Sequence, residues 1–375
     1  MKQFLAWCKK EAVLSVALVL ALVSACFVPP DAAYIDYIDF RTLGILFCLM
    51  AVMAGLQACG VFRVVAEALL RRVGNIRAMV CVLVMLCFFG SMLITNDVAL
   101  ITFVPLTFIV LRLLFPEGRD GLTVSVVVMQ TVAANLGSML TPIGNPQNLY
   151  LYGKSALPLG EFLLLMLPYT LAALVMLLAW CLLFRFDGDK RTRFAPETAA
   201  QVAHKGQIAV YGALFAVSLL AVAHVLHWGI AFAVTLAACL LVNRSVLKKV
   251  DYSLLATFVG FFVFVGNMGR IEAFYDLLAR LIAGNEVLTA VAASQVMSNV
   301  PAALLLSGFT DAYGALLIGT NLGGLGTLIA SMASLISFKY IGAEFRRLRG
   351  KYLLRFTLVN LLFLAVLLGL WLLIG

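Results

Sequence analysis

The chain has 375 residues, of which 63% are hydrophobic and only 12% are charged. Soluble domains are roughly half apolar and a quarter charged, so this composition excludes an ordinary soluble enzyme or binding module and indicates an integral membrane protein. The net charge of +9 is not gathered into a basic patch with interleaved aromatic residues. The expected partner is therefore the lipid bilayer, and no nucleic acid is expected.

Several apolar stretches reach the ~20 residues that a helix needs to cross a bilayer, which predicts an all-α polytopic membrane protein. In chain order, spans are expected at residues 12–28, 42–62, 161–184, 207–226, 229–242, 253–268 and 353–374. Two further crossings contain glycine-rich loops and are expected to be broken helices, at 122–152 and 313–338. Two segments with polar centres are interpreted as re-entrant hairpins, at 78–114 and 287–310.

Two short motifs occur twice. Residues 135–145 read NLGSMLTPIGN and residues 321–331 read NLGGLGTLIAS. Each is preceded by a second matched piece, ITNDVAL at 94–100 and MSNVPAA at 297–303. The alignment pairs residues of the same type, namely Asn96 with Asn299, Asn135 with Asn321, Gly137 with Gly323, and Thr141 with Thr327. Such a repeat inside apolar sequence is typical of a secondary transporter with internal symmetry.

The distribution of basic residues predicts the orientation. If the N-terminus is cytoplasmic, nearly all of the 27 lysines and arginines fall on the cytoplasmic side, as the positive-inside rule expects. Arg355 lies just within the last span, and the residues that fall outside are Arg41, Lys154, Arg270 and Arg280. This topology makes the two matched pieces inverted repeats, and such folds place the binding site near the membrane midplane.

The chain is expected to divide into two halves. The first, residues 1–184, contains a hairpin that enters from the cytoplasm and the first broken helix. The second, residues 207–375, contains a hairpin that enters from outside and the second broken helix. Residues 185–206 are the only long polar stretch, and we expect them to be a cytoplasmic linker.

The motifs of common enzymes and pumps are missing. The chain contains no GxxxxGK[ST] phosphate loop, no HExxH zinc motif and no CxxC pair. We therefore expect a transporter rather than an enzyme. We expect no organic cofactor, and sodium is the one candidate for a bound ion. A passive channel is the alternative from another class, but it would show a continuous polar path, whereas the polar residues here cluster at two tips and two loops.

The glycine-rich loops have an expected physical role. A helix broken at membrane depth frees N–H groups at one end and C=O groups at the other, which are sites for anions and cations respectively. We expect the glycines to allow the bend and the prolines to stop the helix; the residues are Gly137, Gly144, Gly323, Gly324, Gly326, Pro142 and Pro146. The alternative for the glycines is close helix packing.

Asp97 is the one acidic residue deep in an apolar segment. An ionisable group at that depth costs at least ~2.5 kcal/mol, which makes it a functional candidate. We expect it to bind the coupling ion beside Asn96. The alternative is that Asp97, like Asn96 and Asn299, only caps a helix at a hairpin tip.

The motifs TNDVAL, TPIGNPQN, SNVPAALLL and GTNLGGLGT extend this interpretation. Over nearly its whole length the chain resembles the ion transporter superfamily of citrate-transporter-like permeases. That superfamily includes divalent-anion/sodium symporters, arsenite permeases and NhaD-type sodium/proton antiporters. The resemblance implies a scaffold domain that forms a homodimer and a transport domain that moves as an elevator.

The resemblance also implies site residues. In sodium-coupled carboxylate members an SNT triplet at each hairpin tip binds ion and substrate, and similarity places residues 95–97 and 298–300 there. Asp97 and Val300 stand where that triplet has threonine, which favours the arsenite-permease and antiporter branches. The implied substrate-binding residues are Thr95, Asn96, Thr141, Pro142, Asn145, Ser298, Asn299 and Thr327. The implied ion-coupling residues, which are also the candidate sodium ligands, are Thr95, Asn96, Asp97, Asn135, Gly137, Ser298, Asn299, Asn321 and Gly323.

The expected function is secondary active transport of a small anion, a carboxylate or an oxyanion, across the inner (cytoplasmic) membrane. Transport is expected to be coupled to Na+ or H+ and to use alternating access of the elevator type. The alternatives are Na+/H+ antiport and efflux of arsenite.

Overall fold

The computed structural model describes residues 11–115, 118–183 and 201–374, and its regular elements there are all helices. Most of the expected linker at 185–206 lies outside the described residues. The elements before the linker are α2 (Ala12–Phe27), α3 (Ala33–Asp36), α4 (Phe40–Ala58), α5 (Val61–Leu70), α6 (Ile76–Ile94), α7 (Asn96–Leu114), α8 (Asp120–Ser138), α9 (Pro146–Ser155) and α10 (Leu159–Leu183).

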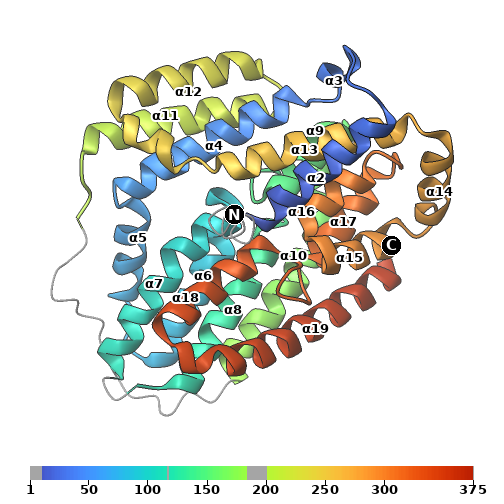
Figure 1. Cartoon of the computed structure of the whole chain (residues 1–375). Coiled ribbons are helices and arrows are strands. Elements are labelled where there is room, and N and C mark those ends of the chain that lie inside the picture. Colours follow the sequence, from blue (N-terminus) through green and yellow to red (C-terminus); the bar gives the residue numbers. More distant parts are fainter. Residues whose placement is uncertain (1–10, 116–117, 184–200, 375) are drawn as a thin grey trace.

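The elements after the linker repeat much of this order. They are α11 (Lys205–Val222), α12 (Trp228–Val242), η1 (Arg244–Lys249), α13 (Tyr252–Gly269), α14 (Glu272–Ile282), α15 (Glu286–Met297), α16 (Asn299–Leu306), α17 (Tyr313–Gly323), α18 (Met332–Glu344), η2 (Arg346–Leu348) and α19 (Arg349–Ile374). Figure 1 shows α18 and α19 in red at the lower edge of the bundle, beside α8.

The lengths of these helices confirm the all-α polytopic fold. Within the described residues, eight helices are long and apolar enough to cross a membrane, or up to nine when one bent pair is counted as a single span. The bent pair is α14 with α15, whose axes differ by 109°. Two of the expected spans are short helices, α2 with 16 residues and α12 with 15.

Helices of each half pack against the other half. The helix α2 packs along α13 of the second half, whereas α11 and α12 pack along α4 of the first half. Figure 1 shows α11, α12 and α4 side by side, away from α8 and α19. Small residues allow the close approach: a Cβ on Gly260 would lie 3.1 Å from the backbone of Ala17, and one on Gly55 would meet the ring of Tyr211. The two halves are therefore interlocked.

Each expected hairpin is a pair of contacting helices joined at a single residue. The pair α6 and α7 meets at Thr95, and the pair α15 and α16 meets at Ser298. The two joints have nearly the same backbone, with φ 71° and ψ 154° at Thr95 and φ 77° and ψ 154° at Ser298. A positive φ is uncommon for these residue types, so the shared geometry shows that both tips make the same sharp turn.

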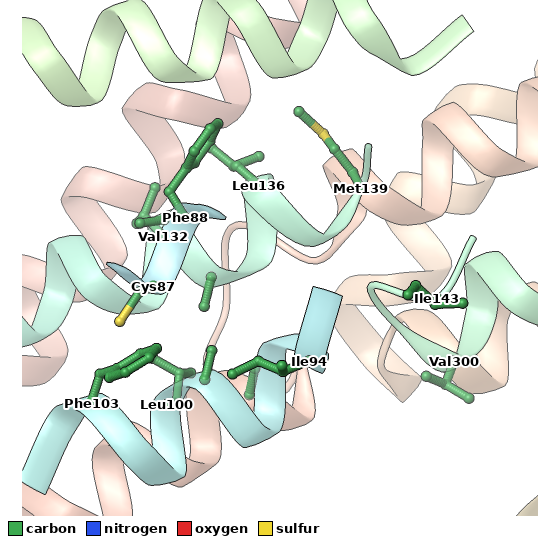
Figure 2. Packing of buried hydrophobic residues seen from close by; sticks show 14 of the residues in the cluster. Cys87, Phe88, Ile94, Leu100, Phe103, Val132, Leu136, Met139, Ile143 and Val300 are labelled. Carbon is green, nitrogen blue, oxygen red and sulfur yellow. The ribbon is translucent and has the colours of Figure 1, made fainter. Parts of the chain in front are cut away.

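The first tip ends inside the protein. Figure 2 shows side chains of α6 and α7 facing those of α8, with Phe88 near Leu136. Ile94, the last residue of α6, is buried, and Ile143 and Val300 lie near one another beyond the tip. A chain that enters along α6 and leaves along α7 thus starts and finishes on the same side.

This return of the chain gives a topology prediction. Single cysteines near Gly74 and Gly118, at the two open ends of the first hairpin, should be labelled by a membrane-impermeant reagent from the cytoplasmic side only. Cysteines near Asn285 and Asp311, at the ends of the second hairpin, should be labelled from outside only. Labelling of Gly74 and Gly118 from opposite sides would contradict the hairpin interpretation.

Candidate functional site

The chain between α8 and α9, residues 139–145, forms the first break, and the chain between α17 and α18, residues 324–331, forms the second. The two hairpin tips are bound to these breaks by equivalent hydrogen bonds. At the first tip the backbone N–H of Asn96 donates to the carbonyl of Gly144, at 3.0 Å. At the second tip the N–H of Asn299 donates to the carbonyl of Ala330, at 2.9 Å. Gly144 and Ala330 occupy the same position in the repeat. Each tip therefore satisfies a carbonyl that its neighbouring break would otherwise leave unpaired at membrane depth.

The paired threonines hold the same elements together. The hydroxyl of Thr141 donates to the carbonyl of Met92 at 2.6 Å, and that of Thr327 donates to the carbonyl of Gln295 at 3.1 Å. Met92 and Gln295 each lie three residues before a tip. These contacts position the breaks against the hairpins; the expected role of both threonines in substrate binding stays a prediction.

The paired glycines pack helices rather than bend them. Gly137 and Gly323 are the last or nearly the last residues of α8 and α17. A Cβ on Gly137 would lie 2.0 Å from the Phe88 carbonyl oxygen and 2.6 Å from the Ser91 hydroxyl, and one on Gly323 would lie 2.6 Å from the hydroxyl of Ser294. The expectation that these two glycines allow a bend is thus wrong, because only a residue without a side chain fits against the first hairpin arm.

Of the other residues in and beside the breaks, Gly326 has its expected role and Pro146 does not. Gly326 has a φ of +106°, so this glycine does allow the turn of the second break. Pro146 does not stop α8, which ends at Ser138, but instead occupies the first position of α9 after the N-cap Asn145. That position suits proline because its missing N–H has no partner there in any case. Pro142 lies buried in the break itself.

A buried amide network joins the two breaks to each other. Asn145 of the first break donates to Oδ1 of Asn321 in α17 at 3.0 Å. Ser331 of the second break donates to Oδ1 of Asn135 in α8, also at 3.0 Å. The bonds are reciprocal, because Asn145 aligns with Ser331 and Asn135 with Asn321.

A second reciprocal pair strengthens the network. Asn321 donates to Oδ1 of Asn148 at 2.6 Å, and Asn135 donates more weakly to the hydroxyl of Ser334 at 3.5 Å. Asn96 adds the first tip to the same network by donating to Oδ1 of Asn135 at 3.3 Å. All of these side chains are buried, so the loss of one partner would leave a polar group without a hydrogen bond.

The asparagines at the tips are not the helix caps. Thr95 is the N-cap of α7, and its hydroxyl accepts a long hydrogen bond from the N–H of Val98. Oδ1 of Asn96 accepts from the N–H of Asp97 at 2.9 Å. The N–H groups of residues 96, 97 and 98 are therefore all used within the protein.

Asp97 lies next to a cavity of about 160 Å³. Its Oδ1 is buried and has no hydrogen-bond partner among the described residues. The cavity lies between α4, the first tip, the first break and the start of α13; its polar lining is Gln57, Thr95, Asp97, Asn145, Lys249 and Asp251. A carboxylate oxygen without a partner in such a place is an acceptor free for an ion, a proton or a solute.

The structure therefore brings Thr95, Asp97 and Asn145 together at one cavity. The expected residues of the second tip lie elsewhere: Ser298 and Asn299 are buried against the second break, and Thr327 is exposed. Sequence reasoning missed Gln57, Lys249, Asp251, Gln295, Ser331 and Ser334. Ser331 could have been found, since it aligns with Asn145 in the repeat.

Comparison with known proteins identifies the family. Residues 4–314 match the family described as "Citrate transporter". The chain belongs to the citrate transporter family. It is therefore a multi-pass membrane transporter and not an enzyme, and the family lies within the ion transporter superfamily that the motifs resemble.

Relatives of this citrate-transporter-family chain share most of its length. It is 32% identical over 311 residues to the inner membrane protein YbiR of Escherichia coli, covering 80% of each chain. It is 30% identical over 332 residues to an uncharacterized transporter of Methanocaldococcus jannaschii, covering 88% of each. A shorter match, 35% identical over 161 residues, joins 42% of this chain to 32% of the silicon efflux transporter LSI3 of Oryza sativa.

The contacts of Gly137 give a stability prediction. Gly137→Ala should lower the free energy of unfolding by about 1–3 kcal/mol, because the added methyl would overlap Phe88 and Ser91. Thermal denaturation of the purified protein in detergent measures the effect. Gly121→Ala, in the same helix with nothing within 4 Å of its Cβ, is the control and should change stability by less than about 1 kcal/mol. Equal effects of the two substitutions would refute the packing role.

Proposed function

We propose that this family member is a secondary transporter for a small, oxygen-rich solute, coupled to Na+ or H+ through Asp97. The observation that carries the proposal is the unpartnered, buried Oδ1 of Asp97 beside the cavity. A carboxylate in that position can bind a sodium ion directly or carry a proton. The charged form of Asp97 is costly at membrane depth. The protein with a cation bound at Asp97 therefore favours a different conformation from the protein with no cation bound there.

The neighbouring groups suit a solute with several oxygen atoms. The hydroxyl of Thr95 and the amides of Gln57 and Asn145 line the same cavity and can exchange hydrogen bonds with hydroxyl or carboxylate oxygens. The solute classes that fit are a carboxylate, an oxyanion or the neutral acid of an oxyanion. In this proposal the substrate binds between the first tip and α4, and the coupling cation binds at Asp97.

Two observations favour the neutral acid over a strongly charged anion. The N–H groups at the start of α7, which would be the natural anion donors of a helix N-terminus, are already occupied. Asp97 would also repel a fully ionised solute. One relative is named a silicon efflux transporter, and silicic acid is largely neutral near pH 7. Efflux of a neutral oxyacid, the class that includes arsenite in its protonated form, is therefore the second candidate.

The position of the cavity supports a proposal of alternating access. The cavity is lined by Lys249 and Asp251, which lie between α12 and α13, in a connection that the positive-inside rule predicts to be cytoplasmic. We infer an arrangement open to the cytoplasm, with the N-terminus inside. The helices α2, α4, α11, α12 and α13 would form the scaffold of a homodimer, and the hairpins with their breaks would move against it as an elevator.

Asp97→Asn tests the coupling role. The substitution keeps the size and most hydrogen bonds but removes the charge, so solute uptake driven by an imposed Na+ or pH gradient should fall more than tenfold. Exchange of solute against solute, which needs no net cation movement, should be retained. Both rates are measured in proteoliposomes. The matched control is Asp276→Asn, on the exposed face of α14, which should leave both rates unchanged. Normal gradient dependence in Asp97→Asn would refute the coupling role.

The tips themselves give a further prediction. Asn96→Ala and Asn299→Ala should each lower transport at least tenfold, because each removes amide atoms at a tip rather than core volume. The amount of folded protein, followed by gel filtration, should stay close to that of the unsubstituted chain. Unchanged transport in both variants would refute the model of paired tips.

A stability screen addresses the substrate class. Ligands that bind the folded state raise the midpoint of thermal denaturation. Carboxylates, oxyanions, arsenous acid and silicic acid would be compared, each with and without Na+ and at several pH values. Stabilisation by neutral oxyacids alone would select efflux, and stabilisation by carboxylates that requires Na+ would select symport.

A further inference from the structure

The cavity beside Asp97 contains a second carboxylate, which the proposed function does not use. The charged side chains that line the cavity are Asp97 on α7, Lys249 in η1 and Asp251 at the start of α13. Asp251 is exposed and lies close enough to Asp97 for the two carboxylates to interact electrostatically. No ion pair joins Asp251 to Lys249 or to any other residue in the part of the chain that the structure describes.

The internal repeat supplies a comparison for Asp251. Asp39 caps α4 in the first half, and Asp251 caps α13 in the second, with nearly the same backbone: φ −78° and ψ 83° against φ −80° and ψ 83°. Each accepts a hydrogen bond from the N–H three residues later, at 2.9 Å. As a cap alone, the two aspartates are equivalent.

The two aspartates differ in their second oxygen. Oδ2 of Asp39 accepts a hydrogen bond of 2.5 Å from the hydroxyl of Thr42. The residue at the position of Thr42 in the second half is Leu254, which offers no hydroxyl. Among the described residues, Asp251 therefore keeps one oxygen without a partner, and it lines the cavity where Asp39 does not. A charge is unnecessary for capping, since asparagine caps helices about as well as aspartate.

We propose that Asp251 is an entry carboxylate for the coupling cation, which it attracts into the cavity and passes to Asp97. The inference rests on the proposed function, because it requires that Asp97 binds the cation. Two carboxylates and one ammonium group leave the cavity lining with a net negative charge, which raises the local concentration of cations. The ammonium group of Lys249 opposes this attraction.

The charge at Asp251 can be removed while the cap is kept. Asp251→Asn should raise the half-saturating Na+ concentration of transport, or shift its half-maximal pH for a proton-coupled carrier to more acidic values. The expected size is about fivefold, the order of magnitude for one unit charge that acts on another in largely water-exposed surroundings. The maximal rate should be unchanged, since Asp97 remains. Lys249→Gln should change the half-saturating concentration in the opposite direction.

The matched control is Asp39→Asn, which alters the equivalent cap in the other half and lies away from the cavity. It should leave the half-saturating concentration unchanged. Proteoliposome assays at low ionic strength give the largest effect, and 0.3 M choline chloride should shrink the Asp251→Asn difference because salt screens an electrostatic attraction. Asp251→Ser, a second capping residue, should reproduce the result, with the thermal denaturation midpoint as a check of folding.

The outcomes separate the two proposals. A change of the same size in Asp251→Asn and Asp39→Asn, or a change that does not respond to choline chloride, would overturn the role of Asp251. If gradient dependence is lost in Asp97→Asn while Asp251→Asn is indistinguishable from the unsubstituted chain, the entry role fails and the proposed coupling stands. If Asp97→Asn keeps its gradient dependence, the coupling itself fails.

Discussion

The need to hydrogen-bond every backbone polar group within apolar surroundings controls the centre of this structure. Two helices are broken there, and each break exposes N–H and C=O groups that lipid cannot satisfy. Carbonyls of the breaks are satisfied by the hairpin tips, through the N–H groups of Asn96 and Asn299, and by side-chain amides of the asparagine network. Asn148 donates to three carbonyls at the first break, and Asn135 donates to the carbonyl of Gly324 at the second. The breaks, the tips and the network are therefore interdependent, because each supplies hydrogen-bond partners that another lacks.

The internal symmetry is strong in the backbone and weak in the charges. Thr95 and Ser298 share their φ and ψ, Asp39 and Asp251 share theirs, and Gly137 and Gly323 meet equivalent hairpin residues. The chemistry differs at a few positions, where Val300 stands against Asp97 and Leu254 against Thr42. The two tips therefore share a backbone conformation, but only the first carries an acid.

The network also bears on what could move as one body. Asn145, Asn148, Ser331 and Ser334 join the first break to the second across the two halves. Breaking these buried bonds during each cycle would leave several polar groups unsatisfied, at about 1–3 kcal/mol for each. Motion of both breaks and both hairpins together, against the helices around α4 and α13, avoids that cost. The elevator proposal thus has a physical basis in the interior of the protein.

The sequence by itself determined the class and the frame. Its composition predicted a polytopic helical protein, its repeat predicted two hairpins beside two broken helices, and its motifs pointed to the family that comparison identified. These features are local or periodic, and apolar length and residue spacing are read directly from a chain. Asp97 was found for the same reason, because a single acid in an apolar run is visible without a structure.

Only the tertiary structure decided which residues share a site. From the sequence, Gly137 was expected to allow a bend, but it is a packing contact. The Phe88 carbonyl that occupies the space where its side chain would lie is far away in sequence. Asp251 was not singled out in the sequence, and the second tip looked equivalent to the first, yet the cavity is lined by Asp251 and by the first tip. Cavities and reciprocal hydrogen bonds are made by side chains that distant segments bring together. Their positions depend on how the two halves interlock, which no local pattern encodes.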